Sequence, residues 1–348
     1  MSGLLATIVL SVMIDRSQYS VARPFSRASA ARRKGLLCVL ATLPVFCVSW
    51  QLSYAVGQAQ TPQDQNLHHL RANRSLIHYL DNINLLIEPS SVCQKKVPVL
   101  VLVTSTPSHY RHRDVIRNTW GKHQETYFFL GLTQDDDRIA NAYIEAKQHS
   151  DLIVHELQDH YQNLTLKVAL MLQWALHRCP QAEFVFKTDD DVMLNPRTLE
   201  TVLEDNKGAA LFGYKHENKV PYRDEYTKWY MPRWLYNEDL IPEYLSGPGY
   251  IINGKNLKEI FTAALHIPLI NIEDIYFTYL VAKRALGLPL THDRRLSPYK
   301  PWIFTCPYKN YASIHSLSPE EMDIVWSKIQ SSGESQFCSY FTSGLLLY

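Results

Sequence analysis

The chain has 348 residues, of which 46% are hydrophobic and 20% charged, and its formal net charge is +1 at pH 7. This composition is that of a globular protein and excludes a disordered or collagen-like chain. The near-zero net charge argues against a nucleic-acid-binding protein that works through a basic face. The length allows one large domain or two of ordinary size.

The N-terminal part of the sequence predicts a membrane anchor. Residues 35–57 carry no charge and are long enough to span a bilayer, which needs about 20 residues. Basic residues stand directly before this run, at 32–34, and the next one after it is Arg71, so the positive-inside rule predicts a cytosolic tail over 1–34 and a type II orientation. A cleaved signal peptide is the alternative, but its apolar core is only about 7–15 residues long. The sequence does not assign a role to a shorter apolar stretch over 3–14.

A mostly polar segment over 58–96 predicts a stem, which leads into the main domain over 97–348. Two N-glycosylation sequons, at Asn73 and Asn163, suit a lumenal location for both parts. Cysteines beyond the predicted span allow three pairings in an oxidising compartment, and the sequence does not choose among them. These cysteines are Cys93, Cys179, Cys306 and Cys338.

From residue 97 onward, predicted strands and helices alternate. Short apolar runs predict strands over 97–105, 125–132, 151–157 and 183–188, and GAALFGY and PGYIING predict two more. Periodic segments between them predict helices over 137–149 and 163–178. This alternation predicts an α/β fold with a mostly parallel central sheet. Ligands of such sheets bind beyond the carboxyl ends of the strands, so functional residues should directly follow strands.

Three adjacent aspartates, Asp189, Asp190 and Asp191, follow the predicted strand over 183–188. Adjacent carboxylates repel one another unless a cation or solvent compensates their charge. A hard divalent ion, bound by one or two carboxylates together with phosphate oxygens, would do so. A solvated acidic turn is the alternative, but the position after a buried strand favours a metal site.

Other candidate residues follow the same pattern. Arg113 and Arg117 come after the first predicted strand, and a helix would place both guanidinium groups on one face, where they suit phosphate oxygens. Asp274 would lie in the first turn of a helix, where it could act as a base or only stabilise the helix dipole. His315 shortly precedes a predicted N-cap at Ser318. Taken singly, each has a structural alternative: a basic surface helix, a first-turn acid and a packed histidine.

Taken together, these segments resemble the β-1,3-glycosyltransferases of glycosyltransferase family 31. The matching stretches keep the family's order over roughly residues 97–330, and they are RHRDVIRNTWG, YFFLGL, HSDLIVHELQDHYQNLTLKVALMLQW, EFVFKTDDDV, KWY, YLSGPGYIING, IEDIYFTYLVAKRALGL and IHSLSPEEMDIVW. So many ordered motifs make the resemblance specific. It implies a GT-A-type nucleotide-sugar-binding domain with a mostly parallel sheet, preceded by a single transmembrane helix in the Golgi membrane.

The resemblance also implies roles for individual residues. A divalent metal, Mn²⁺, would be bound by Asp191, Asp189 and His315. The UDP-sugar donor would be bound by Arg113, Arg117, Lys167 and Asp190. The general base of the family matches Asp274. The cleft for the sugar and the acceptor matches Trp229, Gly247, Gly249, Tyr250 and Glu273. Two departures from the family pattern, IEDIYFTYL and PRWLYNEDL, bear on the acceptor more than on the reaction.

The implied reaction is an inverting transfer of a hexose, with galactose favoured, from a UDP-sugar to the 3-hydroxyl of a glycan on a glycoprotein or glycolipid. Three alternatives stay open: a β-1,3-N-acetylglucosaminyltransferase, a non-catalytic glycan-binding protein of the same fold, and a metal-dependent phosphohydrolase built on the aspartates. The last would need more metal ligands than the residues after Asp191 offer. We expect no nucleic-acid partner, and a homodimer is possible.

Overall fold

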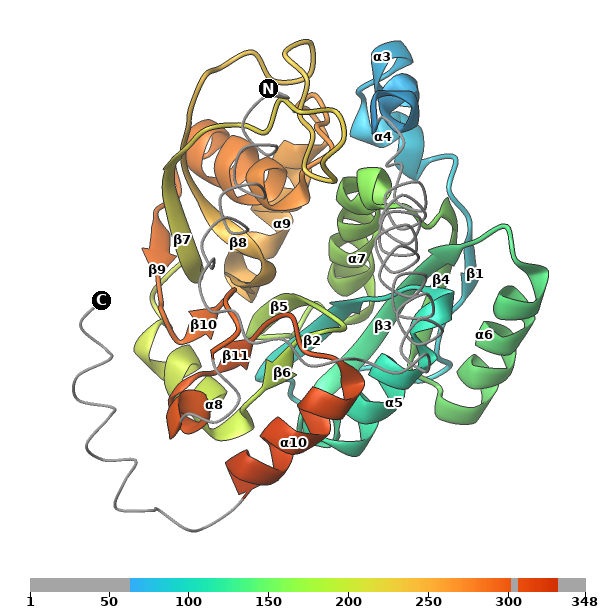
Figure 1. Ribbon diagram of the computed structural model, residues 1–348, viewed down its shortest axis with the longest axis vertical. Coiled ribbons are helices and arrows are strands. Elements are labelled where there is room, and N and C mark those ends of the chain that lie inside the picture. Colours follow the sequence, from blue (N-terminus) through green and yellow to red (C-terminus); the bar gives the residue numbers. More distant parts are fainter. Residues whose placement is uncertain (1–62, 302–305, 331–348) are drawn as a thin grey trace, which may run out of the picture. The chain divides into compact units, whose positions relative to one another are not determined.

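The computed structural model describes residues 63–301 and 306–330, which belong to one compact unit. A central sheet of eight strands, in the order β1-β4-β3-β2-β5-β8-β7-β9, organises this unit (Figure 1). In that order the strands are β1 (Leu85–Ile87), β4 (Leu152–Gln158), β3 (Glu125–Leu132), β2 (Val99–Thr104), β5 (Phe184–Asp189), β8 (Ile241–Asn253), β7 (Leu211–Lys219) and β9 (Leu290–His292).

The sheet is mixed: parallel pairs are in the majority, as predicted, but β8 and β1 run antiparallel to their neighbours. Within the described residues, four of the seven neighbouring strand pairs are parallel, namely β4–β3, β3–β2, β2–β5 and β7–β9. β8 runs antiparallel to both of its neighbours, β5 and β7, and β1 runs antiparallel to β4. β7 and β8 are joined by a loop without a crossover helix, and antiparallel neighbours need no such helix. An apolar run in a sequence predicts a strand but not its direction.

Helices cover both faces of the sheet. One face packs against α7 (Leu164–Arg178), α9 (Gly254–Ala264) and the π-helix η5 (Ile275–Ala285). The other packs against α5 (Tyr110–Asn118), α6 (Asp136–His149), α8 (Pro196–Asp205) and α10 (Pro319–Gln330). α6 and α7 confirm the helices predicted over 137–149 and 163–178.

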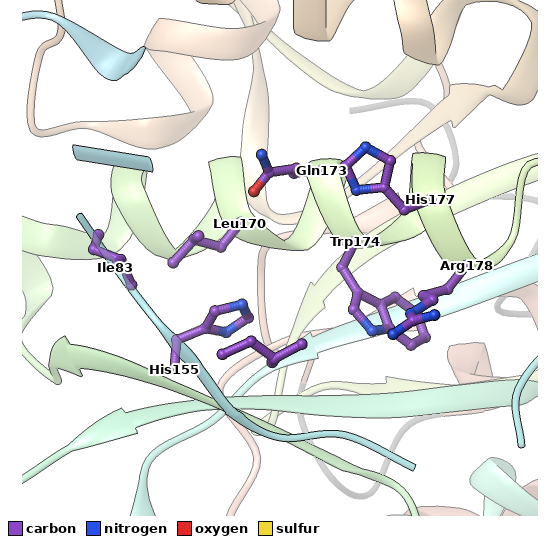
Figure 2. A pocket seen from close by; sticks show the side chains of 8 residues that line it. Ile83, His155, Leu170, Gln173, Trp174, His177 and Arg178 are labelled. Atoms are coloured by element: carbon purple, nitrogen blue, oxygen red, sulfur yellow. The ribbon is translucent and has the colours of Figure 1, made fainter. Parts of the chain in front are cut away.

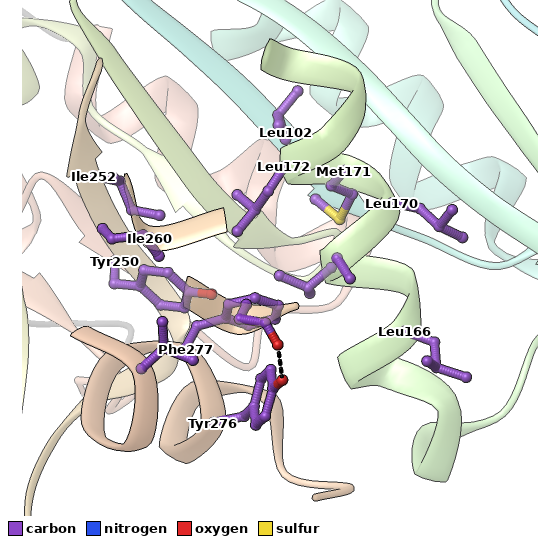
Figure 3. Packing of buried hydrophobic residues seen from close by; sticks show 14 of the residues in the cluster. Leu102, Leu166, Leu170, Met171, Leu172, Tyr250, Ile252, Ile260, Tyr276 and Phe277 are labelled. Carbon is purple, nitrogen blue, oxygen red and sulfur yellow. Dashed lines mark hydrogen bonds between the residues drawn. The ribbon is translucent and has the colours of Figure 1, made fainter. Parts of the chain in front are cut away.

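Side-chain alternation along the strands divides the apolar residues between two cores. In β2, Leu100 and Leu102 pack toward α7, whereas Val99, Val101 and Val103 belong to the core on the other face. Figure 3 shows part of the core between α7, β8 and η5. Because β2 is buried on both faces, it reads as an uninterrupted apolar run.

Part of the segment predicted as a stem packs against the domain. η1 (Gln63–Leu67), α3 (His68–Ala72) and α4 (Leu76–Leu80) contribute Leu67, Leu70 and Leu76 to the same core as α7. A disulfide joins Cys93 to Cys179 at the end of α7, with 5.6 Å between the Cα atoms. The bond selects one of the pairings that the sequence left open, and Cys338 and the Cys306 side chain lie outside the described part of the chain.

None of the described helices is long and apolar enough to cross a membrane. The predicted span over 35–57 and the predicted tail over 1–34 lie outside the described residues. The fold class is therefore corrected: the described residues form an α/β domain with a mixed sheet and include no helix that matches the single transmembrane helix of the prediction.

Candidate active site

The predicted metal ligands meet beyond the carboxyl end of β5. Asp189, Asp191 and His315 each offer one ligand atom, and these three atoms lie within 4.8 Å of one another. Asp189 ends β5, and His315 directly follows β11 (Ser313–Ile314). β11 pairs with β6 (Met193–Leu194), which follows the aspartates, so a small second sheet carries the histidine to them. We call Asp189, Asp191 and His315 the metal cluster.

The imidazole of His315 is oriented for metal binding. Its Nδ1 lies 3.1 Å from the carbonyl oxygen of Pro298, and its Nε2 lies 3.3 Å from Oδ2 of Asp191. A proton on Nδ1, donated to the carbonyl, leaves Nε2 as the free ligand atom. Burial by itself would lower the pKa of His315, but the Asp191 carboxylate outweighs it and raises this pKa. Two carboxylates and one imidazole fit a divalent cation such as Mn²⁺.

The middle aspartate, Asp190, is directed away from the metal cluster. It is buried, and its Oδ2 accepts a hydrogen bond of 2.6 Å from Oγ of Ser105. Nδ1 of His109 lies 2.9 Å from the same oxygen. Asp190 therefore ties the segment after β2 to the segment after β5, and the sequence analysis missed both of its partners.

A buried lysine that the sequence analysis also missed joins the metal cluster to the candidate base. Lys187 lies in β5, and its Nζ is 2.8 Å from Oδ1 of Asp189 and 2.8 Å from Oε1 of Glu273. The same Nζ donates a hydrogen bond of 2.7 Å to the carbonyl oxygen of Gly247. Lysines are almost never fully buried without partners, so a lysine within the apolar run EFVFKT is the sequence signal that could have identified it.

Burial and the charge on Lys187 act in opposite directions on the pKa values of its two carboxylate partners. Burial alone would lower the pKa of Lys187, but the carboxylates of Asp189 and Glu273 outweigh it and raise this pKa. Burial would likewise raise the pKa of Asp189, but the ammonium of Lys187 outweighs it and lowers this pKa. For Glu273 burial prevails over Lys187, and the pKa is raised.

Asp274 stands at the N-terminus of η5, where two backbone N–H groups hold its carboxylate. Its Oδ1 accepts a hydrogen bond of 2.8 Å from N of Ile275, and its Oδ2 accepts one of 2.9 Å from N of Gly247. Burial raises the pKa of Asp274 to about 7, and the neighbouring Glu273 carboxylate adds to the shift. A pKa near neutrality is that of an effective general base.

Close packing explains two of the predicted cleft glycines. A Cβ atom at Gly247 would lie 3.1 Å from Oδ2 of Asp274, so the absence of a side chain lets the backbone N–H reach the carboxylate. A Cβ atom at Gly249 would lie 3.1 Å from the ring of Phe186. The two glycines therefore bring β8 close to its neighbours.

The other predicted cleft residues differ in solvent exposure. Trp229 is 44% exposed, in the loop between β7 and β8. Tyr250 is fully buried and donates a hydrogen bond of 2.9 Å from its hydroxyl to Oε2 of Glu273, which is also buried. Tyr250 and Glu273 are thus buried beneath the surface of the site, where they bind each other, and do not line that surface as predicted.

The structure pairs the predicted donor-binding arginines with carboxylates. Nε and Nη2 of Arg113, which is fully buried, donate hydrogen bonds of 2.8 and 2.6 Å to Glu145. Nη2 of Arg117 donates one of 2.7 Å to Glu145, and Nε donates one of 2.7 Å to Asp151. Both guanidinium groups lie on one helix face, as predicted, but that face is turned toward α6.

Lys167 and Arg113 connect to the site through Ser105. Nζ of Lys167 donates hydrogen bonds of 2.8 Å to the carbonyl oxygen of Ser105 and 2.6 Å to Oδ1 of Asp159. Nη1 of Arg113 donates one of 2.8 Å to Oγ of Ser105, which in turn binds Asp190. These contacts place both residues behind the loop that follows β2.

The two sequons lie at helix ends. Asn73 is the C-cap residue of α3, and its Oδ1 accepts a hydrogen bond of 2.8 Å from N of Ser75. Asn163 is the N-cap residue of α7, and its side-chain amide donates one of 3.1 Å to the carbonyl oxygen of Gln158. Glycosylation at both positions stays a prediction.

A cavity of about 350 Å³ lies apart from these residues, between α7 and the edge strand β1 (Figure 2). Burial lowers the pKa of His155, one of its lining residues, to about 4. None of the predicted site residues lines this cavity, and we assign it no part in the reaction.

Comparison with known proteins points to one family. The family model described as Galactosyltransferase matches residues 111–293. "Beta-1,3-galactosyltransferase 5" of Mus musculus is 30% identical over 257 residues, which cover 71% of this chain and 83% of that protein. "Beta-1,3-galactosyltransferase 1" of Homo sapiens is 29% identical over 336 residues, or 92% of this chain and 91% of that protein. Among solved structures, a glycosyltransferase involved in the glycosylation of the major capsid of PBCV-1 aligns with a TM-score of 0.36 and 12% identity, over 65% of this chain and 96% of that chain, a likeness too distant to support an inference.

Proposed function

Because the chain belongs to the galactosyltransferase family and is a glycosyltransferase, we propose that it transfers galactose from UDP-galactose to the 3-hydroxyl of a glycan acceptor, with formation of a β-1,3 linkage. The names of the relatives support the donor and the linkage. The observation that carries the mechanism is the bridge of Lys187, which joins the metal cluster to the loop that holds Asp274.

The metal cluster supports the binding of the donor diphosphate through a divalent cation. Asp189, Asp191 and His315 would hold Mn²⁺. When bound, the cation supplies positive charge that neutralises the diphosphate as UDP leaves. On the protein side, Lys187 keeps Asp189 ionised, and the carbonyl of Pro298 keeps Nε2 of His315 free.

Asp274 is proposed as the general base. It accepts the proton of the acceptor 3-hydroxyl while that oxygen bonds to the anomeric carbon of galactose from the face opposite UDP. The bond between the anomeric carbon and the diphosphate oxygen breaks, its electron pair leaves with UDP, and the configuration inverts. The backbone N–H groups of Gly247 and Ile275 orient the carboxylate. Such assistance typically contributes about 10²–10⁴-fold to the rate.

The other predicted roles follow from the contacts described above. Arg113, Lys167 and Asp190 are proposed to position the loop after β2 beside the donor, because all three bind Ser105. Arg117 acts indirectly, because it binds Glu145, which also binds Arg113. Trp229 and the surface near Gly247 and Gly249 are proposed to face the acceptor.

The disulfide between Cys93 and Cys179 supports an oxidising compartment. We propose the Golgi lumen, where a glycosyltransferase meets glycoproteins and glycolipids. The predicted domain over 97–348 is proposed as the catalytic part of the chain, together with the segment before it that packs on the core.

A donor screen tests the proposal. The purified chain is incubated with Mn²⁺, a panel of neutral glycan acceptors, and UDP-galactose, UDP-N-acetylglucosamine or UDP-N-acetylgalactosamine in turn, and UDP release is measured. We expect acceptor-dependent release with UDP-galactose alone. Release with another donor would replace galactose in the proposal, and release that needs no acceptor would indicate hydrolysis. A chain that binds no UDP in the presence of Mn²⁺ would contradict the proposed function.

A further inference from the structure

Four aromatic side chains form a continuous row at the antiparallel end of the sheet. The ring of Tyr299 lies 5.4 Å from that of Tyr214, the ring of Tyr214 lies 5.3 Å from His216, and the ring of His216 lies 5.1 Å from Tyr244, measured between centroids. We call Tyr299, Tyr214, His216 and Tyr244 the aromatic strip. Three such steps exceed the width of a single sugar ring.

Strand register aligns the strip. His216 of β7 stands directly opposite Tyr244 of β8, and Tyr214 precedes His216 by two residues, beside an irregularity in the pairing of β7 with β8. His292 at the end of β9 packs its edge against Tyr214, with 5.0 Å between the centroids. Three members of the row, Tyr214, His216 and Tyr244, therefore stand on paired strands, which hold their rings more rigidly than a loop would, while Tyr299 stands in the bend after β10 (Leu296–Ser297).

Both ends of the strip adjoin the candidate active site. Tyr299 follows Pro298, whose carbonyl oxygen binds His315 of the metal cluster. Tyr244 lies three residues before Gly247, whose N–H binds Asp274. Burial raises the pKa of Tyr244, and the charge of the Asp274 carboxylate adds to the shift, as expected for two groups close in space.

The chemistry of the strip suits a neutral oligosaccharide. Tyr299 is 57% exposed, and Tyr214, His216 and Tyr244 are half-buried. Aromatic faces attract the C–H face of a sugar ring, and phenolic hydroxyls and imidazole nitrogens can bond its hydroxyl groups.

Four of the charged side chains beside the strip are paired with one another. Oε1 of Glu243 accepts an ion pair of 2.7 Å from Nζ of Lys283, and Oε2 accepts one of 3.4 Å from Nζ of Lys215. Lys215 also pairs with Glu217 at 2.7 Å. Lys219, at the end of β7, also acts on His216 and has no ion pair among the described residues, but the other four charges compensate one another, which favours a neutral glycan over a sulfated or sialylated one.

We propose that the aromatic strip binds part of a neutral oligosaccharide acceptor. The sugar at the non-reducing end of the acceptor receives the transferred hexose, and the strip binds the sugars that precede it toward the reducing end. The inference rests on the proposed function, since it assigns the acceptor side of the same site. It makes Tyr214 and Tyr299 specificity-determining residues, which favour acceptors of two or more sugars over single sugars.

Direct titration tests the strip without turnover. The full chain, with Mn²⁺ and UDP, is titrated calorimetrically with neutral glycans of one to four sugars that end in N-acetylglucosamine or galactose. We expect affinity to rise with glycan length, and Tyr299→Ala to weaken binding of the tetrasaccharide about tenfold while leaving the single sugar unchanged. Tyr299→Phe, which keeps the ring but lacks the hydroxyl, should weaken binding less than Tyr299→Ala does, and Tyr143→Ala, which removes an exposed tyrosine on α6 that is 38% accessible, should bind like the wild-type chain. Tyr214→Ala provides a second, independent loss.

The outcomes separate the strip from the reaction. Affinity that is independent of glycan length, or a tetrasaccharide affinity that survives both alanine variants, overturns the strip even if galactose transfer is normal. If the wild-type chain does not bind UDP, the proposed function is contradicted. The dependence of glycan affinity on glycan length, measured in the same titrations, still tests the strip. Thermal unfolding of each variant identifies any loss of affinity that is due to misfolding.

Discussion

Around the parallel strands β2, β3 and β4, buried charges pair one for one, whereas beside β8 two carboxylates share a single lysine and a third carboxylate has no ion pair among the described residues. Arg113 and Arg117 are matched by Glu145 and Asp151. At the other end of the site, Lys187 pairs with Asp189 and Glu273, and Asp274 has only backbone N–H groups to hold it. Removing one partner of the balanced pairs would leave an uncompensated buried charge and destabilise the fold. Beside β8, burial and the Glu273 carboxylate raise the pKa of Asp274, a kind of shift that active sites use to prepare acids and bases.

The largest expected effect is on the turnover number, in a variant of Asp274. Asp274→Asn removes the base but keeps an acceptor oxygen for the N–H of Gly247 or Ile275. We expect the turnover number to fall by about 10²–10⁴-fold while UDP affinity changes little. Steady-state kinetics and calorimetry with UDP measure the two quantities.

Asp137→Asn is the matched control, because Asp137 is an exposed aspartate in the first turn of α6, outside the candidate active site. Its turnover should equal that of the unchanged chain. Near-normal turnover by Asp274→Asn would remove Asp274 from the base role and end the contrast between the two regions.

In the network of Arg113, Arg117 and Glu145, the expected effect is on the stability of the fold. Glu145→Gln leaves two buried guanidinium groups short of one negative charge, and we expect the free energy of unfolding to fall by about 3–5 kcal/mol. Denaturant titration measures the change. Glu204→Gln on α8, which breaks an exposed pair with Lys207, should change it by less than about 0.5 kcal/mol. Equal effects of the two variants would show that the buried network does not stabilise the fold.

A smaller effect is expected at the metal cluster. Asp191→Asn removes one proposed ligand, and we expect Mn²⁺-dependent UDP binding to weaken by about 10–100-fold. Calorimetry with UDP, with and without Mn²⁺, measures it, and Asp136→Asn, an exposed acid at the start of α6, serves as the control. Unchanged binding by Asp191→Asn would contradict the metal assignment.

The smallest effect is the pH dependence of the rate. Because burial raises the pKa of Asp274 to about 7, the base is protonated below that pH, and kcat/KM should fall about tenfold per pH unit on the acid side. The same shift means that folding favours the protonated carboxyl, so Asp274 lowers the stability of the fold as pH rises from about 4, its usual value, to about 7. The residual activity of Asp274→Asn should lack the limb near pH 7. A limb near pH 4 in the unchanged chain would show that the carboxylate is not desolvated.

Much of the site was predictable because its signals are local. The apolar run before Asp189 predicted β5, and periodicity predicted α6 and α7 within a residue or so. The four-residue spacing of Arg113 and Arg117 correctly predicted a shared helix face. Their partners Glu145 and Asp151 were not predictable, since they follow 32 and 34 residues later and are reached only when α5 packs against α6 and the start of β4.

The sequence by itself predicted most strands and helices of the domain from residue 97 onward, and the residues proposed to carry the chemistry other than Lys187, because hydrophobic period and motif order need no long-range contact. Only the tertiary structure decided the antiparallel course of β8, the burial of Lys187 between two carboxylates, and the row of rings from Tyr299 to Tyr244. It also decided that Asp274 titrates near neutrality. Strand direction, desolvation and the distances between charges depend on which distant segments pack together, and no local pattern encodes that packing.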